Sequence, residues 1–536
     1  MQNDLIKIEK LFLQQNYIQA ERIARKLLEQ HPNKFISYKA LGVALAAQKK
    51  IKEALETLLH AQSFENSDFD VNVNLSLLYL EIQNIEPSID YGKKAIQIDG
   101  NRPEPYLNLA RCMMIQRDYI TAEKYALKSI ELRGGKLQAA KGGFGDLFET
   151  LLDSLLAQNK SQECIDLCIE ILDEVHLFIC LTTLMELDFS NVKNLYIQRV
   201  RDFLATSNNE SNVSDFLQLK SFCHFSLANY HSKLKDRATS EEHYIKANEF
   251  ALEWQRFMPM ARQKRFQRTI DFFTNQEEKL KKLEIPKNKG ENIIFILGMP
   301  RSGTTLTESI VATNSNVFAG GELAFFEHEI KKEEVSLKME SQSLDIDFFL
   351  NLGDKYLAQT NFIKNDKEYI TDKMPDNYRF LGYIKIALPG AKFIHISRNP
   401  WDNAISLFKQ IYLANILYST SFFNIGLEYA NHLCIMAFWN KFFGNDVCLS
   451  LKYEQLVQNY EKTTDEIWKF CAFKDSLDLK SRANFYARTA SKTQVRGEVH
   501  QRSLKKTEFI EKKEIFEEAL NNQLDHWKRK YQIFNI

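Results

Sequence analysis

The stretch IIFILGMPRSGTTLTES, residues 293–309, decides the fold of the C-terminal half of this 536-residue chain. Its first five residues are apolar and mostly β-branched, which is typical of a buried parallel strand. A loop containing Gly298, Pro300 and Gly303 follows, and a helical pattern begins after it. Loop N–H groups and a helix N-terminus in this order point at the same bound oxygens. We therefore expect an anion-binding loop.

The spacing Gly298-x4-Gly303 is that of a Walker A loop, but Thr304 stands where the Walker lysine belongs. That lysine contacts the terminal phosphates of ATP or GTP. Its replacement argues against an enzyme that uses a nucleoside triphosphate and favours another phosphate-bearing donor. A glycine-containing turn without a ligand is the alternative interpretation.

The loop sequence PRSGTTL, residues 300–306, resembles the 5′-phosphosulfate loop of sulfotransferases, which use 3′-phosphoadenosine-5′-phosphosulfate (PAPS). It looks most like the loops of tyrosylprotein sulfotransferases and of bacterial sulfotransferases with an N-terminal repeat domain. The resemblance implies a PAPS-binding P-loop-like α/β domain with a central parallel sheet. It also implies that five loop residues bind the donor: Arg301, Ser302, Gly303, Thr304 and Thr305.

A second segment, residues 391–406, reads as a buried strand followed by a helix start. Arg398 ends the strand and Ser406 follows eight residues later, so that a guanidinium fork and a hydroxyl can reach one phosphate. The segment resembles the 3′-phosphate motif of sulfotransferases. A surface arginine and an ordinary helical serine are the alternative.

Two later segments resemble nucleotide contacts of the same family. A strand is predicted to end at Tyr453, within Tyr-Glu-x-Leu-Val, where the tyrosine of the family contacts the nucleotide. Residues 489–497 resemble a late basic loop that closes over the 3′-phosphoadenosine. Arg496 is the candidate there, and Lys505 and Lys506 are less favoured. Packing explains many strand-end tyrosines, and solvated charges explain many basic residues.

Sulfuryl transfer requires a base for the acceptor hydroxyl and positive charge at the departing oxygen. Glu322 lies 21 residues after Arg301, the spacing of the catalytic glutamate in tyrosylprotein sulfotransferases. Leu323 replaces that family's second glutamate, which puts the acceptor contacts in doubt. Lys373, before Met-Pro, matches the family's active-site lysine, and Arg301 is expected to act on the same oxygen. A capping carboxylate and a solvated lysine are the alternatives.

Three histidines are rival bases, because some small-molecule sulfotransferases use a histidine: His328, His395 and His500. His395 falls inside a predicted strand and is expected to be packed.

The N-terminal region repeats with a period of 34 residues. One unit carries Tyr38, Leu41, Gly42, Leu45, Ala54, Leu58 and Ala61 at the marked places of a tetratricopeptide repeat. Small residues recur at the third and fifth places, where two helices must cross closely. Four aligned units predict a curved solenoid, whose groove we expect to bind a protein or peptide; a purely structural platform is the alternative.

The charge, the cysteines and the hydropathy of the chain limit which partners, metal sites and membrane spans we expect. Lys and Arg total 70 and so do Asp and Glu, which gives no reason to expect nucleic acid or an anionic membrane as partner. Eight cysteines form no Cys-x-x-Cys pair, so we expect no metal site. Residues 1–15 do not resemble a signal peptide, and no apolar run is long enough to span a bilayer. We expect a cytoplasmic protein of undetermined oligomeric state.

These patterns predict a solenoid over residues 1–255, with clear repeats in 1–134 and degenerate helix pairs after them. A helical linker over 256–288 and a sulfotransferase domain over 289–536 follow. The predicted activity is transfer of a sulfuryl group from PAPS to a hydroxyl, of a peptide tyrosine or of a sugar. A P-loop nucleotide kinase and a repeat scaffold with an inactive transferase domain remain alternatives.

Overall fold

The computed structural model describes residues 1–65, 67–142, 145–174, 178–206, 213–255, 257–332, 338–341, 343–364, 366–412, 416–473 and 507–531. The chain falls into two compact units, Met1–Cys164 and Ile165–Ile536. The predicted boundaries at residues 255 and 289 stay predictions. No helix in the described ranges is long and apolar enough to cross a membrane.

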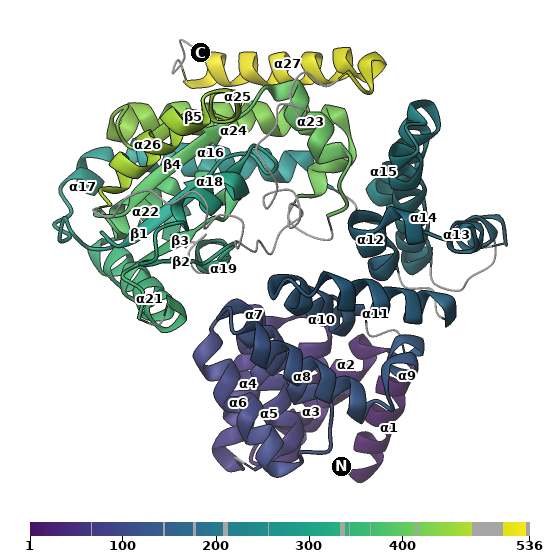
Figure 1. Ribbon diagram of the computed structural model, residues 1–536. Coiled ribbons are helices and arrows are strands. Elements are labelled where there is room, and N and C mark those ends of the chain that lie inside the picture. Colours follow the sequence, from purple (N-terminus) through teal and green to yellow (C-terminus); the bar gives the residue numbers. More distant parts are fainter. Residues whose placement is uncertain are drawn as a thin grey trace. The chain divides into compact units, whose positions relative to one another are not determined.

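The first unit is a series of antiparallel helix pairs (Figure 1). Its helices are α1 (Gln2–Leu13), α2 (Tyr17–Gln30), α3 (Phe35–Ala47), α4 (Ile51–Phe64), α5 (Phe69–Glu81), α6 (Ile85–Ile98), α7 (Glu104–Ile115), α8 (Tyr119–Leu132), α9 (Lys136–Lys141) and α10 (Gly145–Ala157). The second helix of each pair starts at residue 17, 51, 85 or 119, which is the predicted 34-residue period. The helical repeat is therefore confirmed.

Two details show why the repeat needs its residues. The turn inside each of the four pairs has one residue in the left-handed region: Gln15, Lys49, Gln83 and Arg117, with φ between 55° and 60°. A methyl group on Gly42 would lie only 2.5 Å from Leu58 Cδ2, so a larger residue there would displace the Leu58 side chain that packs between α3 and α4.

The second unit begins with helices and continues into an α/β domain. Its first helices are α12 (Phe178–Leu187), α13 (Asn194–Thr206), α14 (Val213–Lys233), α15 (Arg237–Gln255), α16 (Pro259–Asn275) and α17 (Glu277–Lys281), and α11 (Ser161–Glu174) crosses the boundary between the units. Asn159 and Lys235 lie in left-handed turns between helices, as in the clear repeats.

The sheet of the second unit has five parallel strands in the order β2-β3-β1-β4-β5. They are β1 (Ile293–Leu297), β2 (Val317–Ala319), β3 (Tyr369–Asp372), β4 (Lys392–Ser397) and β5 (Leu449–Lys452). The predicted parallel sheet is confirmed. The last strand ends at Lys452, one residue before the predicted end, and Tyr453 opens the next helix.

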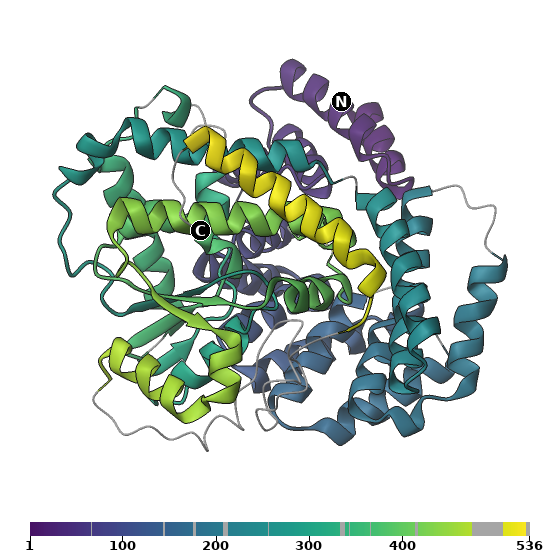
Figure 2. The ribbon, with the colours of Figure 1, turned by 90° about the horizontal axis from the view of Figure 1, so that it is seen from above.

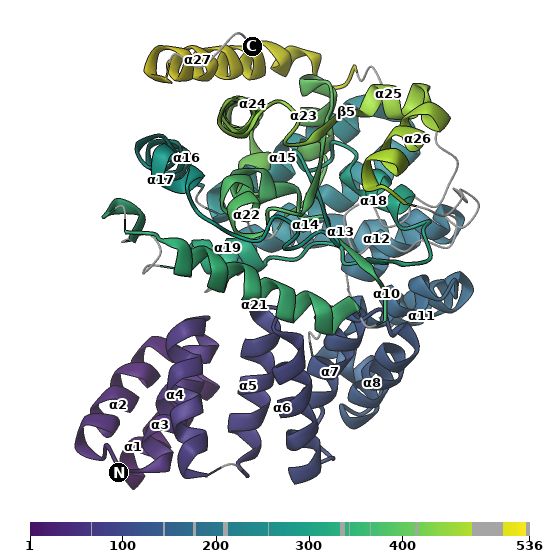
Figure 3. The same cartoon turned by 90° about the vertical axis from the view of Figure 1, so that its left-hand side faces the viewer.

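Helices cover both faces of this sheet (Figure 3). Ile294 and Ile296 of β1 pack with residues of α18 (Thr304–Val311) and α26 (Tyr460–Cys471) on one face. On the other face Phe295 stacks with Phe393 and contacts Tyr356 of α21 (Ile346–Lys364). Burial on both faces explains why the strands are continuously apolar.

The remaining described elements of this unit are η1 (Phe189–Asn191), α19 (Phe325–Ile330), η2 (Pro375–Arg379), α22 (Leu381–Ala387), α23 (Pro400–Phe408), η3 (Leu417–Thr420), α24 (Phe422–Phe443), α25 (Tyr453–Gln458), η6 (Ile510–Lys512) and α27 (Lys513–Tyr531). Helix α27 lies along α24 (Figure 2). Gln523 and Trp527 of α27 both donate to Asn431 Oδ1 of α24, at 3.0 and 2.9 Å. These two hydrogen bonds fix the C-terminal helix to the α/β domain.

Candidate functional site

The loop between β1 and α18 packs closely against strand β4 and the start of helix α25. Gly298 has a φ of 150°, and a Cβ there would lie 2.2 Å from the carbonyl oxygen of Ile396 in β4. Gly303 has a φ of 113°, and a Cβ there would lie 2.5 Å from the ring of Tyr453. Both positions require glycine for two reasons, the backbone angle and the space.

The interior of this loop fits a bound phosphate group. The Ser302 side chain is 1% exposed, and its hydroxyl has no hydrogen-bond partner among the described residues. Thr304 and Thr305 are also buried and begin α18. The first N–H groups of a helix have no partner within it, so they can donate to an anion. An orphaned buried hydroxyl beside them is the group that such an anion would satisfy.

The structure brings Arg398 and Ser406 to the same loop. Arg398 Nη1 donates to the carbonyl oxygen of Arg301 at 3.0 Å and to Ser406 Oγ at 3.2 Å. Its guanidinium lies 4.6 Å from the centre of the Tyr453 ring, within cation–π range. Arg398 is 8% exposed and Ser406 6%. Four residues that the sequence predicts to bind the PAPS donor therefore form one cluster, although they come from three segments of the chain: Arg301, Arg398, Ser406 and Tyr453.

Local sequence holds the Arg398 segment in place. Asn399 caps α23, and its side-chain oxygen accepts from the N–H groups of Trp401 and Asp402, both at 3.1 Å. Asn403 Nδ2 donates to the carbonyl oxygen of Pro300 at 3.0 Å, joining α23 to the loop. Burial lowers the pKa of the Arg398 guanidinium from its ordinary value. An anion beside it would favour the charged form.

Glu322 and Lys373 form an ion pair at the same edge of the sheet as the loop, where the parallel strands β2 and β3 end. Lys373 Nζ lies 2.6 Å from Glu322 Oε1, although 51 residues separate them. Lys373 immediately follows β3, and its side chain is 1% exposed, whereas that of Glu322 is 40% exposed. The pair thus joins a buried cation to a carboxylate that an acceptor can reach.

The rival histidines lie in different surroundings. His395 is inside β4, and its Nε2 lies 3.0 Å from Nε2 of His432. Burial lowers the pKa of His395 to about 4. His328 is in the short helix α19. The expectation that His395 is packed agrees with its contact with the buried His432.

The candidates of the late basic loop lie outside the described residues, within 474–506. These are Arg496, His500, Lys505 and Lys506. In the described part of the chain, no group of three His, Cys, Asp or Glu side chains is arranged to hold a metal ion.

Sequence reasoning missed several residues of the site. Glu308 and Asp372 are buried carboxylates beside the Glu322 segment. The Tyr412 hydroxyl is buried without a hydrogen-bond partner among the described residues. Burial is the main cause that raises the pKa of this hydroxyl. The charge of Glu322 adds to the rise, and the charge of Arg301 opposes it. Of these three residues, only Asp372 could have been noticed in the sequence, because it is an acidic residue at the end of a predicted strand and directly precedes Lys373.

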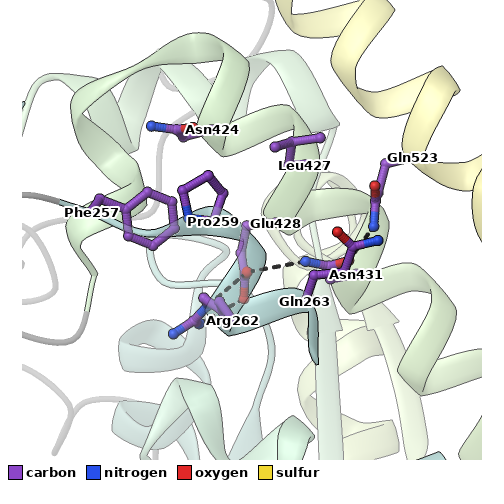
Figure 4. Close-up of a pocket in the computed structure, with 9 residues that line it drawn as sticks. All are labelled: Phe257, Pro259, Arg262, Gln263, Asn424, Leu427, Glu428, Asn431 and Gln523. Atoms are coloured by element: carbon purple, nitrogen blue, oxygen red, sulfur yellow. Dashed lines mark hydrogen bonds and ion pairs between the residues drawn. The ribbon is translucent and has the colours of Figure 1, made fainter. Parts of the chain in front are cut away.

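A buried ionic cluster joins α16 to η2 and α24. Arg262 of α16 donates to both carboxylate oxygens of Glu428, at 2.6 and 2.7 Å, and lies 3.3 Å from Asp376 of η2. It borders a cavity of about 10 Å³, close to the room that one water molecule needs (Figure 4). The cavity is too small for a nucleotide. Because Pro375 also accepts from the N–H of Gly298 at 3.2 Å, η2 is tied to the loop as well as to α16.

Comparisons with known proteins agree with this geometry. Residues 293–476 match the model of the Sulfotransferase family. An uncharacterized protein of Aquifex aeolicus is 31% identical over 329 residues, 56% of this chain and 42% of that protein. The protein-tyrosine sulfotransferase of Drosophila melanogaster is 24% identical over 192 residues, 34% of this chain and 38% of that protein. The chain thus spans about two fifths of the length of these curated relatives.

A solved tetratricopeptide repeat protein from Parabacteroides merdae is 14% identical, with a TM-score of 0.33. The match covers 46% of this chain and 92% of that one. At this score the assignment of the repeats rests on the chain's own 34-residue period. Residues 293–476, which hold the loop, Arg398 and the Glu322–Lys373 pair, are thus similar to the Sulfotransferase family, and in the chain they follow a helical region with a 34-residue repeat.

Proposed function

We propose that this protein transfers a sulfuryl group from PAPS to an acceptor hydroxyl. The observation that carries the proposal is the buried cluster of Arg398 and Ser406 against the β1–α18 loop. A donor with a 3′-phosphate and a 5′-phosphosulfate needs two anion sites, and the contact of Arg398 with both Ser406 and the loop carbonyl of Arg301 supports two adjoining ones here. The family match of residues 293–476 supports the same reaction.

Each residue has a distinct role in this proposal. Arg398 and Ser406 bind the 3′-phosphate, and the loop residues hold the 5′-phosphosulfate. Lys373 and Arg301 stabilise the negative charge that grows on the oxygen between phosphate and sulfur. Glu322 accepts the proton of the acceptor hydroxyl. As the new S–O bond forms, the old S–O bond breaks and 3′-phosphoadenosine-5′-phosphate leaves.

A nucleotide kinase is less well supported, because Thr304 occupies the place of the Walker lysine. An inactive scaffold is less well supported because the proposed base and the proposed cation lie 2.6 Å apart. Magnesium-dependent binding of ATP in preference to the sulfate donor's product would favour the kinase.

Isothermal titration calorimetry tests the donor. The full chain should bind 3′-phosphoadenosine-5′-phosphate more tightly than AMP, because AMP lacks the phosphate that Arg398 is expected to hold. Loss of one charge-assisted contact costs about 1.5–3 kcal/mol, or roughly 10- to 150-fold in affinity. Arg398→Ala should remove most of this preference, whereas Arg529→Ala on the exposed side of α27 should keep it. Equal affinities of the native chain for the two nucleotides would exclude the PAPS assignment.

We further propose that the acceptor is a protein, with its tyrosine as the reacting group, and that the repeat groove binds it; a sugar hydroxyl is the alternative. Among the first helices of successive pairs, α3 contacts α5 and α5 contacts α7, and we infer that these helices line the groove. Asn108 of α7 donates to the carbonyl oxygen of Val73 in α5, at 3.3 Å. Such a continuous face suits an extended polypeptide.

Deletion of residues 1–134 tests this docking role. A tethered groove raises the local concentration of a bound acceptor without changing the chemistry. The deletion should raise KM for a protein acceptor and leave KM for a free tyrosine derivative unchanged. An unchanged KM for the protein acceptor, in a truncated chain that is folded by circular dichroism, would assign the repeats another role.

A further inference from the structure

The segment that carries Glu322, residues 320–323, has no regular secondary structure of its own. Its backbone continues the pairing of β2 with β3: Gly320 N–H donates to the carbonyl oxygen of Thr371 at 3.1 Å, and Lys373 N–H donates to that of Gly321 at 2.8 Å. Two main-chain bonds fix where the segment lies. The N–H groups on either side of Glu322 still need acceptors.

Glu308 accepts the first of these N–H groups. It projects from α18 and is 1% exposed. Its Oε1 accepts from Gly321 N–H at 2.9 Å and from Thr371 Oγ1 at 2.8 Å. One carboxylate thus connects the helix after the donor loop, the Glu322 segment and β3.

Asp372 accepts the second. The N–H of Leu323 and that of Met374 both bond to its buried carboxylate, the latter at 3.1 Å, and the Tyr356 hydroxyl bonds to it at 2.9 Å. Burial raises the pKa of Asp372 to about 7; the Tyr356 and Met374 bonds oppose this rise, and the charge of Glu308 adds to it. The same carboxyl therefore holds the backbone after Glu322 and the backbone after Lys373.

We propose that Glu308 and Asp372 are positioning residues, which hold the backbone on both sides of Glu322 so that its carboxylate faces Lys373. Burying two carboxylates is unfavourable unless each is hydrogen-bonded, and here backbone and hydroxyl donors meet that need. A base on an irregular segment loses its geometry unless a supporting layer fixes it. This inference rests on the proposed function, because it gives Glu322 and Lys373 the roles assigned above.

Four variants test the inference. Glu308→Ala removes the acceptor, and Glu308→Gln keeps an oxygen that can take the same two bonds. Thr371→Val removes one donor to Glu308 with little change in shape, and serves if Glu308→Ala does not fold. Ile310→Ala is the matched control: it is fully buried in the same helix and makes a cavity without touching the Glu322 segment.

The readout needs no identified acceptor. Hydrolysis of PAPS by the full chain uses water as acceptor: the water oxygen bonds to sulfur, Glu322 takes a proton, and sulfate and 3′-phosphoadenosine-5′-phosphate are released. Glu308→Ala should lower kcat about 10²-fold, as expected for a displaced catalytic group. KM for PAPS and the affinity for 3′-phosphoadenosine-5′-phosphate should stay unchanged. Glu308→Gln should retain most of the rate, and Thr371→Val should show a smaller loss than Glu308→Ala.

A crystal structure of Glu308→Ala, or of Thr371→Val in its place, should show residues 320–323 displaced and the ion pair between Glu322 and Lys373 broken. An unchanged kcat, an equal loss of kcat in Ile310→Ala, or an intact ion pair would overturn the inference. If the native chain binds no 3′-phosphoadenosine-5′-phosphate, the proposed function fails, and the crystal structure alone decides whether the two carboxylates hold the segment.

Discussion

The donor side and the acceptor side of the site are built in different ways. On the donor side the proposed binding groups are themselves buried: Arg398 and Ser406 contact each other and the loop backbone. On the acceptor side Glu322 is 40% exposed, and only its supports, Glu308 and Asp372, are buried. A group that holds a phosphate can be fixed in advance, whereas a base must remain within reach of its acceptor. Rigidity at the base therefore comes from the layer beneath it.

The largest effect is expected from a substitution that removes the proposed base on the acceptor side. Glu322→Gln keeps the shape of the side chain but not its ability to accept the proton. We expect turnover to fall by about 10² to 10⁴, with unchanged affinity for 3′-phosphoadenosine-5′-phosphate in calorimetry. Lys373→Ala should also lower turnover, through the leaving group. Near-normal turnover in Glu322→Gln would transfer the role of base to His328 or His500.

The second prediction concerns the buried support of the acceptor side. The native pKa of Asp372, about 7, exceeds that of an unfolded aspartate, about 3.9. Between these values the native state binds more protons than the unfolded state, so the free energy of unfolding falls as pH rises from about 4 to about 7. Three units correspond to about 4 kcal/mol. The Asp372→Asn variant has no carboxyl group at this position that could ionise. Its free energy of unfolding minus that of the native chain should therefore rise by up to this amount between about pH 4 and about pH 7.

Urea unfolding followed by tryptophan fluorescence measures this difference. All five tryptophans lie in the second unit, so the repeat unit does not contribute to the signal: Trp254, Trp401, Trp439, Trp468 and Trp527. Asp525→Asn, at an exposed carboxyl of α27, should not change the pH dependence. A parallel pH course for Asp372→Asn and the native chain would show that Asp372 ionises normally.

The smallest expected effect is on the donor side. Ser406→Ala removes a hydroxyl that contacts Arg398 but leaves the guanidinium in place. A single hydrogen bond is worth about 0.5–1.5 kcal/mol, so affinity for 3′-phosphoadenosine-5′-phosphate should fall by roughly 2- to 12-fold, with little change in kcat. Ser309→Ala, whose hydroxyl bonds only within α18 to the Leu306 carbonyl, is the control. If Ser406→Ala lowered kcat more than it lowered the affinity, the donor side and the acceptor side would have to be coupled.

The amino-acid sequence by itself determined the features that depend on local patterns. The 34-residue period placed the helix pairs, because each pair buries the same small and large residues against its neighbours. The run of apolar residues before Gly298 predicted β1, and the glycines predicted a loop that no larger residue can form. Arg398 and Ser406 could be paired from the sequence because they lie in one short segment, with Arg398 after strand β4 and Ser406 in the helix that follows.

Only the tertiary structure decided which distant groups meet. Glu322 and Lys373 lie 51 residues apart and face each other because β3 pairs with β2 in parallel register. Glu308 was invisible as a functional residue, since nothing in its own helix indicates that its carboxylate accepts the N–H of Gly321. Parallel strands are joined through long connections, so the partners of a buried carboxylate are set by the packing of the sheet and not by neighbours in the chain.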